Sequence, residues 1–338
     1  IKIRYRKKFT KNFNMKKKIY FNKKFKKIIF FGFIDIIEDL IGINKKLNYK
    51  THIITSSNQY KNFKSKKNIK IFDKINTSFE NYLKEINKNE DTLFISLGSR
   101  LIFTKNIINN ICKNNLVNFH ASRLPFSKGG GGFTWRILQN DRIDNQIVHM
   151  VNENIDMGKI LMYEKNLFPK SCTKPHELEK FSNQKMISFY EKFLKNINNN
   201  FDFDLTNNPK YIGSYYPRIN QFDNSYLDWN LKDLELINMI NSFEDPYCGV
   251  TTFLNNKNIK VNIKKAQLHG GELTNHPYMT GIVIRHDNNW IVVSTSGKNC
   301  LIIEEVLDKN KKNILSKVKE GDRFFTPSNL LEKNFNKR

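Results

Sequence analysis

The sequence predicts an α/β fold, with a Rossmann-like, mostly parallel sheet that has helices on both faces, followed by a smaller β-rich C-terminal domain. Two features of the chain predict it. From residue 27 onward, short apolar runs of strand length alternate with amphipathic stretches of helix length, a pattern typical of a parallel sheet covered on both faces. After residue 220 the apolar runs are short, rich in β-branched residues and separated by Asn, Gly and Lys turns, which favours a small barrel or sandwich.

The first domain is predicted over residues 27–199. Its first strand, 28–31, is entirely apolar and ends at Gly32, which indicates a buried strand. The other strands expected, in chain order, are 52–55, 68–72, 92–96, 116–119, 147–151 and 160–163. Between them we expect helices at 34–43, 79–86 and 105–112, and the amphipathic stretch 175–197 predicts a long helix that closes the domain.

Changes of composition predict the remaining boundaries. Residues 200–220 are rich in Asn, Asp, Gly, Tyr and Pro, which predicts a linker. The small β-rich domain is predicted over 221–325, and its expected elements are a helix at 231–240 and strands at 250–254, 259–263, 281–285, 290–293 and 301–306. We expect the chain to fray after residue 322, with a tail at 326–338. Residues 1–26 are dense in Lys and Arg without an apolar centre, which favours a basic, disordered extension over an arm that contacts phosphates, a transit-like segment or sequence upstream of a start at Met15.

Composition excludes some classes of protein and admits others. With 39% hydrophobic residues among 338, a packed core is available. The formal charge of +25 admits nucleic acid, an anionic membrane or an acidic small substrate as a partner, but genomic A/T bias also inflates Lys and Asn, so charge alone decides nothing. No apolar run approaches the roughly 18 residues of a membrane-spanning helix, so an integral membrane protein is not expected. The four cysteines form no CxxC pair, which favours a reducing cytoplasm over a disulfide framework.

The most informative segment surrounds the strand expected at 116–119. Side chains two apart on a strand share a face, so Asn118 and His120 project together while Phe119 turns toward the core. They lie at the carboxyl end of a parallel strand, where open α/β sheets bind ligands. An amide and an imidazole are therefore expected side by side, next to a loop rich in Pro and Gly.

A second segment supplies a carboxylate. Asp156 sits in the turn between the strands expected at 147–151 and 160–163, and Gly158 is expected to permit the backbone geometry that brings that carboxylate inward. Taken alone, an Asp in such a turn more often caps the local backbone than acts in catalysis.

Taken together, three spaced motifs resemble the folate-dependent formyltransferases, the family of methionyl-tRNA formyltransferase, glycinamide ribonucleotide transformylase and the sugar N-formyltransferases. The resemblance covers residues 27–168 well. The motifs are Asn118-x-His120-x-Ser122-x-Leu124-Pro125, Lys128-Gly129 followed by Trp135, and Ile155-Asp156-x-Gly158-x-Ile160. A weaker likeness to the carboxy-terminal region of the sugar and tRNA enzymes lies in 214–218, 228–229 and 245–249.

The resemblance implies transfer of a formyl group from 10-formyltetrahydrofolate, a co-substrate, to a primary amine, with Asn118, His120 and Asp156 as the catalytic trio. These residue types suit the chemistry. Imidazole can take the proton that the attacking amine loses, and an amide N–H can stabilise the oxyanion of the tetrahedral intermediate. Asp156 would orient His120 and stabilise its protonated form. No metal is needed for this step.

The same resemblance places the folate against Gly98, Ser99, Leu124 and Asp156. We expect Arg123, Lys128 and Gly129 to bind the acceptor. Two departures from the family pattern stand out: Arg123 replaces a common leucine, and glycines occupy 130–132. Arg123 could contact an anionic group, whereas the glycine run is either a mobile connector or a contact loop.

Several acceptors and functions remain open at this point. A nucleotide-linked amino sugar is favoured because Tyr215, Tyr216, Trp229 and Tyr247 could stack on a base or sugar, although each could equally pack between domains. Methionyl-tRNA formyltransferase is the chief alternative, since the positive charge suits RNA phosphates. A folate-deformylating hydrolase and a non-catalytic RNA-binding relative are also compatible with the residues. The sequence leaves an oligomer possible. His149 would face the same crevice if its strand register is right, but a core or surface role is favoured for it.

Overall fold

The computed structural model describes residues 17–19, 21, 25–130, 132–206, 213–254, 259–270 and 276–335. The chain forms two compact units. The first unit comprises residues up to Gly129 together with 144–166 and 182–215, and the second comprises 130–143, 167–181 and everything from Tyr216 onward. The sequence placed 130–143 and 167–181 in the first domain. The domain bounds stay a prediction.

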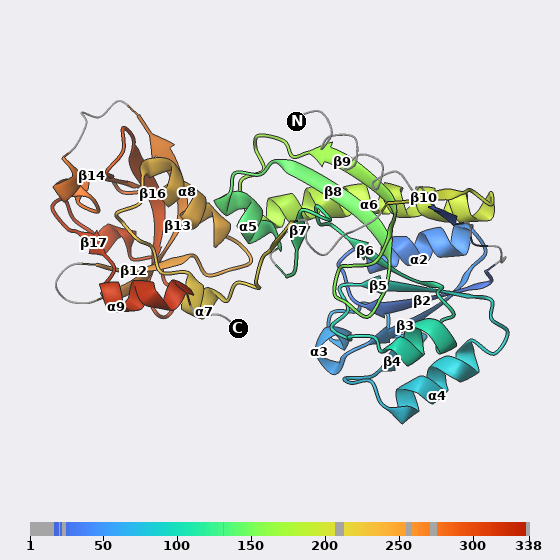
Figure 1. The fold of residues 1–338 in the computed structure, drawn as a ribbon. Helices are drawn as coiled ribbons and strands as arrows, with labels where there is room; N and C mark the ends of the chain where they lie inside the picture. Colours follow the sequence, from blue (N-terminus) through green and yellow to red (C-terminus); the bar gives the residue numbers. More distant parts are fainter. Residues whose placement is uncertain are drawn as a thin grey trace, which may run out of the picture. The chain divides into compact units, whose positions relative to one another are not determined.

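A seven-stranded sheet forms the centre of the first unit, in the order β4-β3-β2-β5-β6-β8-β9 (Figure 1). The five strands from β4 to β6 run parallel, and β8 pairs antiparallel with β6. The mostly parallel sheet is therefore confirmed. The strands are β2 (Lys27–Gly32), β3 (Lys50–Thr55), β4 (Ile69–Ile71), β5 (Thr92–Leu97), β6 (Leu116–His120), β8 (Ile143–Met150) and β9 (Ile160–Leu167).

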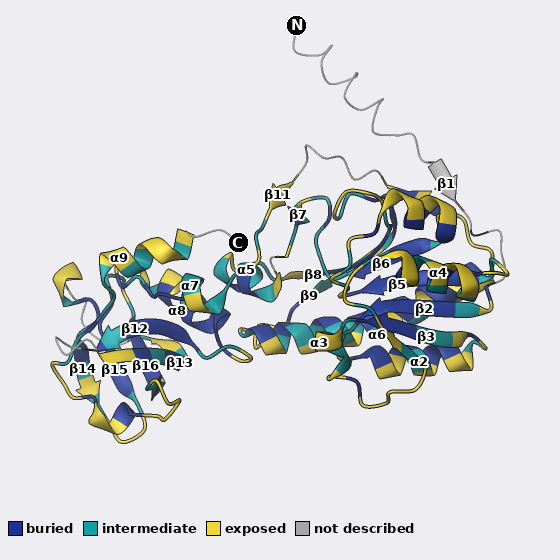
Figure 2. Cartoon of the chain, turned by 90° about the horizontal axis from the view of Figure 1, so that it is seen from below, coloured by how far each residue is buried: buried dark blue, intermediate teal, exposed yellow. Residues whose placement is uncertain are grey.

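Helices cover both faces of this sheet because alternate side chains of its strands point to opposite sides. On β2, Ile28 and Phe30 belong to an apolar cluster with α2 (Ile37–Lys46) and α6 (Pro175–Asn198). Ile29 and Phe31 belong to a second cluster with α4 (Thr77–Ile86) and the π-helical turn Ile107–Ile111. Figure 2 shows the strands between them as buried. The sequence predicted a helix at 105–112, and the π-helical turn occupies that place.

Part of the segment that the sequence assigned to a disordered extension is paired and buried. Strand β1 (Lys17–Ile19) pairs antiparallel with β10 (Phe203–Leu205). Phe21 and Phe25 are each 7% exposed in the core of the first unit, where Phe21 contacts Phe203 edge to face. Aromatic side chains within the basic run supply this burial. Residues 1–16, 20 and 22–24 lie outside the described residues.

The second unit contains a six-stranded antiparallel sheet in the order β14-β15-β16-β13-β12-β17. Its strands are β12 (Val250–Leu254), β13 (Ile259–His269), β14 (Val283–His286), β15 (Ile291–Val293), β16 (Cys300–Leu307) and β17 (Phe324–Phe325). Helix α8 (Asp233–Ser242) buries Leu236 and Ile240 against it. The β-rich C-terminal fold is confirmed. The sequence predicted that the chain frays after residue 322. Instead, the packed part of the second unit continues past it, because Phe324 is buried in this core.

Short elements complete the described chain. In the first unit, β7 (Ser127–Lys128) pairs in parallel with β11 (Ser214–Tyr215). The remaining helices are α3 (Ser57–Tyr60), α5 (Gly132–Leu138), α7 (Gln221–Asn224) and α9 (Ser328–Leu331). Among the described residues, no helix is both long and apolar enough to cross a membrane.

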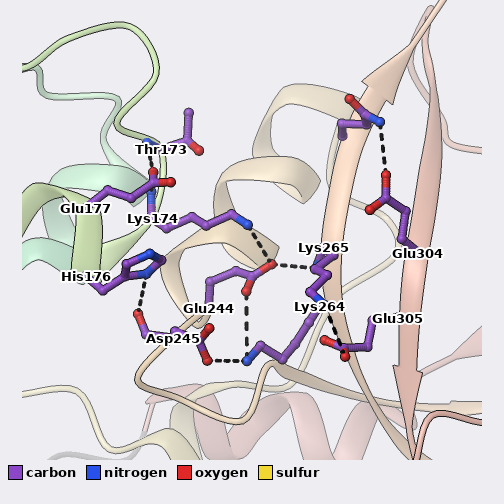
Figure 3. Close-up of polar contacts among 11 residues, drawn as sticks. Thr173, Lys174, His176, Glu177, Glu244, Asp245, Lys264, Lys265, Glu304 and Glu305 are labelled. Carbon is purple, nitrogen blue, oxygen red and sulfur yellow. Dashed lines mark hydrogen bonds and ion pairs between the residues drawn. The ribbon is translucent and has the colours of Figure 1, made fainter.

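A buried carboxylate connects three segments of the second unit (Figure 3). Glu244 is 1% exposed, and its oxygens lie 3.5 Å from Lys174 Nζ and 3.9 Å from Lys264 Nζ. The backbone N–H of Lys265 donates to the same carboxylate. A buried charge is tolerated only when it is paired and hydrogen-bonded. Glu244 therefore holds the start of α6 and strand β13 to the end of α8.

Candidate active site

The end of strand β6 presents two polar side chains on one face, as predicted. Asn118 and His120 are partly exposed, whereas Phe119 between them is 4% exposed. The Phe119 ring packs against Tyr190 and Phe193, with centroids 5.3 Å apart in each pair. Successive side chains of a strand point to opposite faces of the sheet. Because Phe119 is buried on one face, its two polar neighbours point to the other.

Strand β8 brings a third side chain to the same face. In the antiparallel pairing of β6 with β8, Asn118 lies opposite His149 and His120 lies opposite Ile147. Directly opposite residues share a face of the sheet. His149 is 3% exposed, its Nε2 lies 3.1 Å from Asn118 Nδ2, and its Nδ1 lies 2.8 Å from the carbonyl oxygen of Met150.

Asp156 reaches this group from the turn between β8 and β9. Its Oδ1 lies 3.5 Å from His120 Nδ1 and 3.9 Å from His149 Nε2. The backbone N–H of Gly129 donates to its other oxygen over 3.4 Å. Asp156 has a φ of +54°, in the left-handed region that Asp tolerates better than most residues. The three predicted catalytic side chains therefore converge.

Gly158 lies in the turn that carries the Asp156 carboxylate, and the positive φ of this turn belongs to Asp156. A β-carbon at residue 158 would stand 1.5 Å from the Met150 carbonyl oxygen and 3.2 Å from His149 Nδ1. The glycine is therefore required for space, since the turn passes directly against the end of β8.

Burial and charge set the protonation of the group. Desolvation lowers the pKa of His149 to about 4, so this imidazole is neutral near pH 7. Burial by itself would raise the pKa of Asp156, but contact with His120, the charge of the two imidazoles and the Gly129 N–H lower it below its ordinary value. Asp156 is therefore ionised. His120 Nδ1 is buried and makes no hydrogen bond within the described part of the chain, so Asp156 is its electrostatic partner at ion-pair distance.

A cavity of about 190 Å³ opens beside these residues in the first unit. Asn118, Asp156 and Ser99, all predicted site residues, line it. His149 and Arg100 also line it, and sequence reasoning assigned neither of them to the site. The available signal for His149 was strand register, because a residue paired with Asn118 must share its face. The remaining lining residues are Ser96, Leu101, Ile102, Phe103, Val151, Asn152, Glu153, Asn154 and Ile155.

The other residues predicted to bind folate lie outside this lining. Leu124 is 6% exposed and packs with Ile147 and Ile160 in a small apolar cluster. Gly98, with a φ of +60°, adjoins Ser99, and its carbonyl oxygen accepts from Gln59 Nε2 at 3.0 Å.

The residues predicted to bind the acceptor lie in the loop after β6. The Arg123 carbonyl oxygen accepts from the Phe126 N–H at 2.8 Å, which closes a turn. Lys128 is 9% exposed on β7, and Gly129 contacts Asp156 as described above. In the second unit, Gly130 adjoins the Arg218 side chain. Gly131 lies outside the described residues.

The aromatic residues predicted to stack on the acceptor have different surroundings. Trp229 is 6% exposed and stacks on Phe324 with centroids 5.6 Å apart, so it is a core residue of the second unit. Tyr216 packs on Trp135, and Tyr247 packs on Phe243. Tyr215, in the first unit, is 70% exposed.

The site also contains the atoms of a potential metal site. One ligand atom each from His120, His149 and Asp156 lies within 4.8 Å of the others. Two imidazoles and a carboxylate can ligate a divalent transition metal. The Asn118 contact occupies His149 Nε2, so the existing hydrogen bond competes with that use.

Comparison with known proteins finds similarity to formyltransferases. Residues 221–318 match the model described as formyl transferase, C-terminal domain. The methionyl-tRNA formyltransferase of Prochlorococcus marinus (strain MIT 9312) is 26% identical over 275 residues, which cover 77% of this chain and 81% of that protein.

Two solved structures share the fold. The N-formyltransferase from Helicobacter canadensis, in complex with folinic acid and dTDP-3-aminofucose, has a TM-score of 0.63 and 19% identity, covering 83% of this chain and 99% of that one. WlaRD, a sugar 3N-formyl transferase, has a TM-score of 0.61 and 21% identity, covering 86% and 100%. With a matching C-terminal family model and curated relatives along most of its length, the chain is a formyl-transferring enzyme similar to the folate-dependent formyltransferases.

Proposed function

We propose that this enzyme transfers a formyl group from 10-formyltetrahydrofolate to the primary amine of a nucleotide-linked amino sugar. Asn118 and Asp156 line one cavity, and His120, which is outside that lining, lies 3.5 Å from Asp156; this arrangement supports the chemistry. Two proteins of the same fold, one in complex with dTDP-3-aminofucose and the other solved in the presence of dTDP, support the acceptor class.

Each member of the trio has one role in the proposed step. The amine lone pair attacks the formyl carbon, a C–N bond forms, and the carbonyl π electrons move to oxygen, where an N–H of Asn118 stabilises the negative charge. His120 takes the proton that the amine loses. The bond from the formyl carbon to N10 then breaks, and the proton passes to N10 as tetrahydrofolate leaves. Asp156 stabilises the imidazolium form of His120 from 3.5 Å. The proposed reaction uses no metal ion, and the absence of a metal from the site remains a prediction.

The cavity fits only part of a folate. Its volume of about 190 Å³ is below the roughly 300 to 1,000 Å³ of typical small-molecule pockets. We infer that it encloses the ring system next to the formyl group and leaves the glutamate end outside. Ser99 and Asp156 would contact the ring, with Gly98 next to them and Leu124 supporting the site from the apolar cluster behind Ile147.

We assign the acceptor side to the loop after β6. Gly129 connects this loop to Asp156, so Arg123, Lys128 and Gly129 would face an amine that approaches His120. Tyr215 is exposed enough to stack on a base. Trp229 no longer belongs in this set, because it is buried in the core of the second unit.

Charged initiator tRNA is the second candidate acceptor. The curated relatives are named methionyl-tRNA formyltransferase, and the net charge of +25 would favour binding to RNA phosphates. An enzyme of this kind would bind tRNA with an affinity that falls steeply with salt.

We also infer a cytoplasmic location. None of the four cysteines, all of which the structure describes, forms a disulfide. Thiols of this kind are typical of reducing compartments.

A panel of acceptors tests the proposal. Purified enzyme is incubated with 10-formyltetrahydrofolate and either dTDP-linked amino sugars, other nucleotide-linked amino sugars or methionyl-initiator tRNA, and products are detected by a mass gain of one formyl unit. Formylation of a sugar nucleotide supports the proposal. Formylation of tRNA but of no sugar nucleotide would show that the acceptor is tRNA. Release of formate in the absence of any amine would indicate a hydrolase. His120→Ala is the control for enzyme-catalysed transfer.

A further inference from the structure

His149 contacts the side chain that would stabilise the oxyanion. It is buried opposite Asn118 in the β6–β8 pairing, with Nε2 3.1 Å from Asn118 Nδ2. The reaction proposed above gives this imidazole no proton to carry. A buried polar group without a function in the reaction should still have a structural reason for the hydrogen bonds it makes.

The surroundings of His149 fix its tautomer. A carbonyl oxygen can only accept a hydrogen bond, so the 2.8 Å contact with Met150 requires the proton on Nδ1. The ring is 3% exposed, and burial disfavours the charged form that a second proton would create, so Nε2 carries a lone pair. That lone pair faces Asn118 and can only accept.

The tautomer in turn fixes the amide of Asn118. Nδ2 must face His149, because the flipped amide would set the Oδ1 lone pairs against the Nε2 lone pair. One N–H of the amide is thereby committed to His149. The second N–H lies in the same plane and remains available on the face that borders the cavity.

The Asn118 amide lies closer to His149 Nε2 than the charged neighbour Asp156 does. Asp156 Oδ1 lies 3.9 Å from His149 Nε2 and 3.5 Å from His120 Nδ1. Neither group provides a closer donor to Nε2 than the Asn118 amide. Gly158 leaves the space in which the His149 ring reaches the Met150 carbonyl, since a β-carbon there would stand 3.2 Å from Nδ1.

We propose that His149 is a positioning residue, which accepts one N–H of Asn118 and so holds the other N–H toward the formyl oxygen of the donor. The proposal rests on formyl transfer as the reaction but is independent of which amine accepts the group. Without His149 the Asn118 amide can flip. In the flipped form its Oδ1, which cannot donate a hydrogen bond, would face the oxyanion.

Two substitutions separate the hydrogen bond from simple packing. His149→Phe fills a similar volume but has no acceptor, and we expect kcat to fall about 10- to 100-fold, less than the roughly 10²- to 10³-fold typical of losing an oxyanion donor itself. KM for the folate should stay within about twofold, since ground-state binding is not involved. His149→Gln can accept from Asn118 and donate to Met150, so it should retain most of kcat.

A double-mutant cycle distinguishes positioning from general destabilisation. In an Asn118→Ala background, His149→Phe should reduce kcat less than about twofold further, because the side chain that it orients is gone. If the two substitutions reduced kcat by independent factors that multiply in the double variant, the proposal would be overturned. A His149→Phe variant with the kcat of wild type would also overturn it. Thermal unfolding of each variant identifies any that fails to fold.

Nitrogen NMR of the intact enzyme tests the geometry without any assay. Histidine labelled with ¹⁵N should show a proton on Nδ1 of His149 and a bare Nε2 at pH 7. A proton on Nε2 would overturn the proposal even if His149→Phe cannot be purified. If no amine in the panel accepts a formyl group, the proposed acceptor class is wrong. The NMR result still tests the orientation of His149 and Asn118 independently.

Discussion

His120 Nδ1 and Asp156 Oδ1 lie 3.5 Å apart, one at the end of a sheet strand and the other in a turn that follows the neighbouring strand. This pairing leaves the other ring nitrogen of His120 for proton transfer. It also places a negative charge where an imidazolium would form during the reaction.

His120→Ala should abolish most of the transfer. General acid–base catalysis by a positioned side chain contributes about 10² to 10⁴ in rate, so kcat should fall by that factor in an assay of formyl-donor consumption. His276→Ala removes an exposed histidine of the second unit and should leave kcat unchanged. Equal rates for His120→Ala and wild type would remove His120 from the mechanism.

The stability of the enzyme should decrease as the pH falls from about 6.5 to 4, in part because of His149. Its pKa is about 4 in the folded enzyme, compared with about 6.5 for an unfolded histidine. Between these values the unfolded chain binds a proton that the folded chain excludes, which lowers the free energy of unfolding by up to about 1.4 kcal/mol per pH unit. Above pH 6.5 this dependence should vanish.

Urea denaturation at pH 7.5, 6.5, 5.5 and 4.5 measures this effect. His149→Gln cannot titrate in this range, so its stability should fall less steeply than that of wild type. Parallel curves for the two proteins would contradict the assignment.

Gly158→Ala should destabilise the enzyme and disrupt the site. The new methyl group would lie 1.5 Å from the Met150 carbonyl oxygen, so the turn must move, at a cost of about 1 to 3 kcal/mol or more. Asp156 would move with it, and kcat should fall together with the unfolding midpoint.

Gly42→Ala is the matched control for this substitution. Gly42 lies in α2 and is exposed, and a β-carbon added there would have no other atom within 4 Å. Alanine in a helix interior should stabilise the enzyme by about 0.5 to 1 kcal/mol relative to glycine. A Gly158→Ala variant that is as stable as wild type would show that the turn can relax at little cost.

Glu244→Ala should be among the most destabilising single changes in the second unit. Lys174 would lose its buried partner and Lys264 would keep only the exposed Asp245, and removing one member of a buried ion pair typically costs about 3 to 5 kcal/mol. The surface pair of Lys265 with Glu305 provides the comparison, and Glu305→Ala should change stability by no more than about 1 kcal/mol. Similar losses in both variants, measured by urea unfolding, would argue against a special role for Glu244.

Local patterns were sufficient to predict most of the strands and the pairing of Asn118 with His120 on one face. An apolar run such as 28–31 is buried in any compact fold, and strand alternation then fixes which neighbours share a side. The same reasoning could not show that Gly158 is required for space beside Met150, because sequence carries no information about which backbone passes within contact distance.

The sequence by itself determined the alternation of strands and helices and the residue types of a formyltransferase site. Only the tertiary structure decided that Asn118 meets His149, that Trp229 is a core residue, and that Phe21 and Phe25 join the first core. The physical reason is the distance along the chain over which each effect acts. The periods of strands and helices depend on a few neighbouring residues, whereas the register between β6 and β8 and the burial of distant aromatic side chains depend on which segments the whole fold packs together.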